Sequence, residues 1–278
     1  MYPNGGEEQV LGPYQVGALR IMIAGIVLLP IALVHLKKLT KSNFIFILIT
    51  GVFGNLFPAL LFTMAQTRID SSMAGILNMG TSFFVTIIGI IIYKAFPSLR
   101  QLVGLVLGTA GVIMLLRQNL DFEMGDLNYA LLILVATLFY ATSLTTIKFK
   151  LKDVPAVAIT SISFMMILLP ATYLVFHFDA FDPVVNHPDG LKSLGFISIL
   201  AVVGTAIAVM LFTKLIEISN HIFASAVAYM LPIVAIFIGV LDGEKFGWMN
   251  YLYVPAIILG VYLMNRSNSK SKKSPSKS

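Results

Sequence analysis

Cysteine and charge are what this sequence has least of. Its 278 residues include no cysteine, which excludes disulfides and thiolate metal sites. Only 12% of the residues are charged, whereas soluble globular domains average about 25%. With so little charge and a mean hydropathy of +0.89, the chain cannot cover a water-facing surface. The composition therefore predicts an integral membrane protein built from α-helices, because lipid offers no partner to exposed backbone groups.

Motifs for chemistry are missing as well. Hydrolysis inside a membrane requires paired acids, a Ser/His pair or zinc ligands at matched depth. The sequence has no HExxH pattern, and no His or Asp lies in the middle of an apolar segment. It also has no ATP-binding motif, which argues against primary active transport. We therefore expect no enzymatic activity, no metal site and no cofactor.

Nine apolar segments are long enough to cross a bilayer, which takes about 20 residues. They span residues 14–36, 43–66, 72–93, 99–117, 127–149, 154–177, 191–213, 220–241 and 247–265. Residues 1–13 form a polar segment without the apolar core of a signal peptide. Residues 267–278 form a Ser/Lys-rich tail, which we expect to be disordered, to attract anionic lipid and to be too short to bind nucleic acid.

Lysine and arginine are concentrated in alternate loops. Fourteen of the 19 basic residues fall in one set of loops together with the C-terminal tail, and four fall in the other set. Cytoplasmic loops of membrane proteins carry such an excess of Lys and Arg. The pattern predicts a multi-pass protein of the cell (inner) membrane with a cytoplasmic C-terminus and residue 1 outside.

Two long stretches of the chain match each other at an offset of 150 residues. The matches include Phe46 with Phe196, Val52 with Val202, Gly54 with Gly204, Leu61-Phe62-Thr63 with Leu211-Phe212-Thr213, and Ile88-Gly89 with Ile238-Gly239. A nearly ungapped register across three segments indicates an internal repeat. The two copies are five segments apart, an odd number, so the repeat is inverted in the membrane.

Segments 14–36 and 154–177 extend the match, since each is entered through a proline and has Leu-Leu-Pro late in its length. Segment 127–149 has no partner, and we expect its mate to precede Tyr14. The sequence thus predicts an all-α polytopic membrane protein with nine transmembrane helices in an inverted repeat. The first half, residues 14–117, has four helices and is a truncated five, and the second, residues 127–266, has five.

The chain resembles the EamA-type transporters of the drug/metabolite transporter superfamily. The resemblance is carried by Pro13–Arg20, Ala74–Asn78 and Ala224–Pro232, with Gly239 and Glu244. It implies ten helices in two inverted halves and a secondary transporter that exports small organic metabolites, amino acids or drugs by alternating access. The first half departs from the family pattern, with Ser82 and Lys94 where the second half keeps Pro232 and Glu244. Because the first helix of the family pattern is missing, a second hypothesis is a non-transporting truncated remnant or a mis-started gene product; an intramembrane enzyme is disfavoured.

Polar side chains inside the apolar segments are the candidates for a substrate site, because transport requires polar groups near the membrane midplane. Asn55 lies in the middle of segment 43–66, and the repeat places Thr205 at the equivalent point. Asn78, Thr81, Ser82 and Thr86 share one face of segment 72–93. Both sets suit a binding cavity; both also suit helix–helix hydrogen bonds, worth about 0.6 kcal/mol each.

Hydroxyl-bearing side chains in two further segments extend the predicted site. Tyr140 with Ser143, and Tyr229, suit an amphiphilic ligand, although a membrane Tyr also serves plain packing. We assign Pro58 and Pro232 to helix kinks that are either hinges or static, and Glu244 to a gate lip or a structural role.

Three other features have a structural interpretation. Arg20, about 9 Å inside the first span at 1.5 Å per residue, is expected to snorkel to the membrane surface. Lys214 and Glu217 are expected to pair at a helix end. Gly104, Gly108 and Gly111 predict a close helix contact, either within the protomer or in a homodimer.

Overall fold

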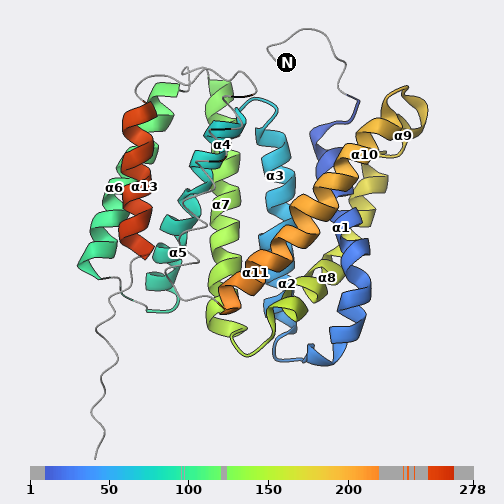
Figure 1. Ribbon diagram of the computed structural model, residues 1–278, viewed down its shortest axis with the longest axis horizontal. Coiled ribbons are helices and arrows are strands. Elements are labelled where there is room, and N and C mark those ends of the chain that lie inside the picture. The colour runs from blue at the N-terminus through green and yellow to red at the C-terminus, as the bar shows by residue number, and fades with distance from the viewer. Residues whose placement is uncertain are drawn as a thin grey trace, which may run out of the picture.

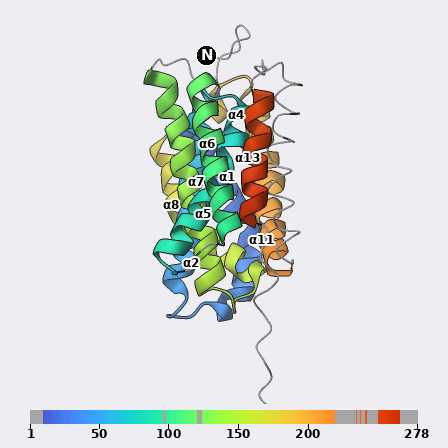
Figure 2. The ribbon, with the colours of Figure 1, turned by 90° about the vertical axis from the view of Figure 1, so that its left-hand side faces the viewer.

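The computed structural model is a bundle of helices (Figures 1 and 2). It describes residues 10–94, 96, 98–119, 124–218, 234, 237, 241 and 250–265. Within these residues there is no β-strand. The elements are α1 Pro13–His35, η1 Leu36–Lys38, α2 Phe44–Gly51, η2 Val52–Leu56, α3 Phe57–Ala65, α4 Ser71–Asn78, α5 Gly80–Ile91, α6 Leu99–Asn119, α7 Met124–Lys150, α8 Ala156–His177, α9 Asp182–Asn186, α10 Gly190–Ala201, η3 Val202–Ile207, α11 Ala208–Ile218 and α13 Asn250–Asn265.

Six stretches of the described chain are long and apolar enough to cross a membrane. They are Pro13–Lys38, Phe44–Ala65, Met73–Ile91, Leu127–Lys150, Ala156–His177 and Gly190–Leu215. The protein is therefore an all-helical, multi-pass membrane protein. Helices α6 and α13 lie where two further spans are predicted, whereas the predicted span 220–241 lies outside the described residues except for three single positions. The total of nine stays a prediction.

One predicted helix differs in the structure. Segment 72–93 is interrupted by a turn at Met79, so that α4 ends at Asn78 and α5 begins at Gly80. Glycine is a poor helix former. Its missing side chain also lets α7 approach, because a Cβ built at Gly80 would lie 3.3 Å from the Thr137 hydroxyl.

Repeat-related helices pack against each other in antiparallel pairs. Gln15, at the start of α1, donates a 2.9 Å hydrogen bond to the carbonyl of Phe178, directly after the end of its mate α8. Helices α6 and α13 form the second such pair, side by side in Figures 1 and 2. An inverted repeat with its symmetry axis in the membrane plane places equivalent helices of the two halves antiparallel to each other, as these pairs are.

The glycines of α6 make this second pair close. A Cβ at Gly260 of α13 would lie 2.6 Å from the backbone nitrogen of Gly108 and 2.7 Å from the carbonyl oxygen of Gly104. One turn further along, a Cβ at Gly111 would meet Ile257. The glycine contact predicted from the sequence is thus made within the protomer.

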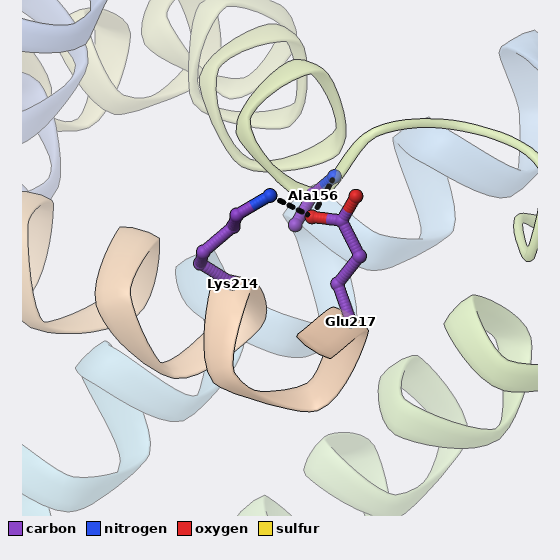
Figure 3. A network of polar contacts seen from close by, with 3 residues as sticks. All are labelled: Ala156, Lys214 and Glu217. Carbon is purple, nitrogen blue, oxygen red and sulfur yellow. Dashed lines mark hydrogen bonds and ion pairs between the residues drawn. The ribbon is translucent and has the colours of Figure 1, made fainter. Parts of the chain in front are cut away.

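The loop ends of the bundle hold the charged groups. Glu217, near the end of α11, accepts a 2.8 Å hydrogen bond from the Lys214 ammonium, and the predicted pair is confirmed (Figure 3). The same carboxylate oxygen accepts the backbone N–H of Ala156, the first residue of α8, at 3.4 Å. The bond from Lys214, helped by that from Ala156, lowers the pKa of the Glu217 carboxyl. This carboxylate therefore caps the positive end of α8.

Candidate functional site

Two π-helical segments occupy equivalent positions in the two repeats. Segment η2, Val52–Leu56, joins α2 to α3, and η3, Val202–Ile207, joins α10 to α11. Their starts are related by the 150-residue offset of the sequence match. A π-helical turn contains an extra residue, is rare and is frequent at functional sites. Because such a turn occurs at equivalent positions of both repeats, we take the region around η2 and η3 as the candidate site.

One polar side chain within each segment bonds the backbone in the same way. The amide Nδ2 of Asn55 donates to the Thr50 carbonyl at 3.4 Å, and the Thr205 hydroxyl donates to the Leu200 carbonyl at 3.2 Å. Both acceptors lie five residues earlier, and both side chains are buried, with 8% and 2% exposed. The predicted equivalence of Asn55 and Thr205 therefore extends to their geometry.

Pro58 lies in the first turn of α3, directly after η2. Proline removes an N–H from the helix ladder, which would explain a local bulge. The equivalent residue in the second repeat is Ala208, however, and η3 forms there without any proline. What the two segments share is a side chain that donates a hydrogen bond to the carbonyl five residues earlier. Pro58 occurs beside the first segment alone.

Arg20 joins α1 to the second π-helical segment. Its guanidinium Nε donates a 2.6 Å hydrogen bond to the Thr205 hydroxyl, which in turn donates to Leu200. Thr205 lies well inside the span Gly190–Leu215. Because the guanidinium is held there, the expectation that Arg20 snorkels to the membrane surface is wrong.

Helix α7 brings two more of the predicted residues to this region. Tyr140 packs against α3, with its ring centroid 6.0 Å from that of Phe62. Ser143 is buried against Gly54 of η2, so close that a Cβ at Gly54 would overlap the serine hydroxyl. Tyr140 and Ser143 are therefore part of the same region as Asn55 and Thr205.

A shared apolar core links the two π-helical segments. Leu56, which follows Asn55, and Ala206, which follows Thr205, pack in one cluster with Ile21 of α1. Helix α1 thus brings Arg20 and Ile21 between η2 and η3. We call this region, around Asn55, Leu56, Thr205 and Ala206, the junction of the two repeats.

The predicted polar face of segment 72–93 makes its contacts locally. The Thr81 hydroxyl donates to the Asn78 side chain at 3.5 Å, and Thr86 donates to the Ser82 carbonyl at 3.1 Å. All four side chains are half-buried. No contact described for them reaches Arg20 or Thr205, so the structure does not join this face to the junction. Tyr229, Pro232 and Glu244 lie outside the described residues.

Sequence reasoning missed two parts of the site: Arg20 and the π-helical turns. Arg20 could have been found from charge placement, since every other charged residue of the six spans lies within two residues of a span end. The π-helical turns left a weaker signal, a polar side chain repeated at the offset of 150 in otherwise apolar helices.

A model of the EamA-like transporter family matches residues 8–117 and, separately, residues 127–266. No curated protein matches the chain. One solved structure, titled "Crystal structure of protein", matches with a TM-score of 0.61 and 16% sequence identity, covering 91% of this chain and 87% of the other. At that identity the likeness shows a shared fold.

Proposed function

The chain belongs to the EamA-like transporter family, and from that premise we propose that it is a secondary transporter that moves small organic molecules by alternating access. The proposed direction is export across the cell membrane, with the C-terminus in the cytoplasm. Metabolites, amino acids and drugs are the proposed cargo.

The observation that carries the proposal is the pair of π-helical segments at equivalent positions. Transporters with inverted repeats bind substrate near the midplane, where helices depart from regular geometry. A regular helix uses every backbone carbonyl in its own ladder, whereas a π-helical turn disturbs that ladder and leaves carbonyls for side chains or ligands. Asn55 and Thr205 use one such carbonyl each.

The proposed binding surface is the junction that surrounds these segments, with Arg20 added to the predicted residues Asn55, Tyr140, Ser143 and Thr205. Asn55 has hydrogen-bonding capacity to spare, because the described contacts use only one of its amide N–H groups. Asn78, Thr81, Ser82 and Tyr229 are proposed as additional lining. Pro58, Pro232 and Glu244 are proposed to act at hinges or gates.

Counterflow in proteoliposomes tests the transport proposal across several substrate classes at once. Purified protein is reconstituted with a panel of labelled zwitterionic amino acids, organic acids and lipophilic cations. We expect saturable exchange of at least one class above the rate in protein-free liposomes. No exchange of any class would contradict the proposal and favour a non-transporting chain.

Variants of the π-helical segments link the flux to this site. Asn55→Ala and Thr205→Ala each remove a side-chain hydrogen bond, and losses of about 1–1.5 kcal/mol predict a reduction in exchange of roughly tenfold. Thr67→Ala is the matched control, since the Thr67 hydroxyl donates to the Met64 carbonyl at 2.7 Å, beyond the end of the span Phe44–Ala65. An equal loss of exchange in Thr67→Ala would show that the flux does not depend on the π-helical segments.

A further inference from the structure

Arg20 is a charged group placed where membrane proteins rarely tolerate one. Among the six described spans it is the only charged residue more than two positions from a span end. Charged residues inside a membrane pair with another group or serve transport, because their burial is costly. The partner of Arg20 therefore decides which interpretation holds.

The described residues supply Arg20 with little compensation. A guanidinium has five N–H donors, and one of them, at Nε, bonds the neutral hydroxyl of Thr205. The described spans contain no Asp or Glu. The ion pair seen in the described chain, Lys214 with Glu217, lies at a helix end. The positive charge of Arg20 thus has no carboxylate partner within the described residues.

The Thr205 bond orients the guanidinium more than it neutralises it. Because the bond uses Nε, both terminal NH2 groups remain for another acceptor, and paired N–H donors of this kind bind a carboxylate through two parallel hydrogen bonds. Tyr140 brings a hydroxyl to the same region, from the part of α7 that packs against α3 and η2.

The charge is present in one repeat only. The sequence match between α1 and α8 has an offset of 140 to 142 residues. The residue of the second repeat that is equivalent to Arg20 is therefore Thr160, Ser161 or Ile162, all of which are buried and uncharged. A helix-packing role shared by both repeats would not require a cation. A role toward a single bound anion requires only one.

We propose that Arg20 is the anion-binding group of the transport site, and that the transported molecules carry a carboxylate or a similar oxyanion. This inference rests on the proposed function. It adds a substrate class, organic acids and zwitterions such as amino acids, and gives lipophilic cations no favourable contact with Arg20.

The absence of cysteine allows a direct test. In Tyr140→Cys the introduced thiol is the only one in the protein. Its labelling rates with a sulfonate-bearing and a trimethylammonium-bearing methanethiosulfonate are compared, each relative to the rate with a free thiol in buffer. A nearby unpaired cation concentrates anions, and we expect a preference of about tenfold for the anionic reagent.

Removing the charge gives the matched comparison. Added to Tyr140→Cys, Arg20→Gln is expected to bring the preference to about one, whereas Lys214→Gln, which removes a cation at a helix end, leaves it unchanged. An unchanged preference in Arg20→Gln would overturn the inference, and so would a thiol that reacts with neither reagent. The unreactive thiol would also contradict the transport proposal, whereas unselective labelling would leave that proposal standing.

A second measurement keeps Arg20 and therefore does not depend on how Arg20→Gln folds. Labelling of Tyr140→Cys by the anionic reagent is followed in the presence of benzoate or of benzylamine, which have the same ring and opposite charge. We expect benzoate to slow the labelling and benzylamine to leave it unchanged. Equal protection by the two would overturn the inference.

Discussion

The two helices that contain the π-helical segments η2 and η3 have a similar backbone conformation but different surroundings. In the apolar 18-residue stretch of Phe44–Ala65, the span that contains η2, 39% of the residues are buried, whereas in that of Gly190–Leu215, which contains η3, 22% are buried. Gly54 faces Ser143 on α7 so closely that no side chain fits, whereas at its mate Gly204 a Cβ would meet, among the described residues, the side chain of Leu200 on the same helix.

This difference shows what the bulge does not require. The contact of Gly54 with Ser143 on α7 has no described counterpart at the exposed Gly204, although α1 packs against η3 through Arg20 and Ile21. What the two turns share is a side-chain bond to the carbonyl five residues earlier, from Thr205 to Leu200 and from Asn55 to Thr50. Packing then decides how each bulge is used: η2 anchors α7, and η3 receives the guanidinium of Arg20.

The largest expected effect comes from comparing Gly260 of α13 with Gly111 of α6, which lie at the same helix contact. Gly260→Ala would force a Cβ against the backbone of Gly104 and Gly108, which cannot move without separating the helices. Gly111→Ala meets mainly the side chain of Ile257, which can shift. Overpacking costs about 1–3 kcal/mol, and we place Gly260→Ala at the upper end and Gly111→Ala at the lower. Thermal unfolding in detergent compares them, and equal midpoints would contradict the close crossing.

The second prediction addresses the bulged helices themselves. Gly54→Ala introduces a Cβ that overlaps Ser143 and is expected to destabilise the protein by about 1–3 kcal/mol. Gly204→Ala introduces a Cβ that reaches no other helix of the described chain and is expected to be neutral or to stabilise by up to about 1 kcal/mol, because Ala favours helix over Gly. The double variant Gly54→Ala/Ser143→Gly is the control, and should recover part of the loss. A Gly204→Ala variant as unstable as Gly54→Ala would show that Gly204 is packed as tightly as Gly54.

The smallest expected effect is the pH dependence of the contact between α11 and α8. Glu217 has a pKa below its ordinary value of 4.5, because the charged carboxylate accepts hydrogen bonds from Lys214 and Ala156. Its contribution is therefore present above the unfolded pKa and is lost as the pH falls through the folded one. The equivalent position in the first repeat is Thr67, which has no such charge.

Glu217→Gln should remove this acid dependence by slightly lowering the stability above pH 6, while the two proteins converge at low pH; the difference is small because the ion pair is exposed. Unfolding midpoints of the two proteins between pH 6 and pH 3 provide the measurement. Parallel pH profiles for them would mean that Glu217 does not stabilise the α8 terminus.

The sequence predicted much of the fold because membrane helices are specified by composition, length and charge placement. The helical class, the repeat offset and the Lys214–Glu217 pair all follow from such features. The turn at Met79 was not predictable in the same way, because the polar residues beside it, Asn78, Thr81 and Ser82, fit one face of a continuous helix equally well, and only the approach of α7 to Gly80 makes a glycine useful there.

The site was predicted in part for a related reason. The register of the repeat identified Asn55 and Thr205 as equivalent, and the structure gives them the same bond. Arg20 was assigned to the membrane surface because its distance from the span end fits snorkelling as well as burial. Only the packing of α1 beside η3 distinguishes the two, and that contact joins residues 185 positions apart in the sequence.

The matching positions of the two π-helical turns also bear on how the repeat arose. One extra residue in a helix rotates everything that follows it, so a bulge gained separately in each copy would fall at unrelated positions. The turns begin instead at Val52 and Val202, with their polar residues in register. A shared register is what a bulge already present in the duplicated unit would leave in both copies.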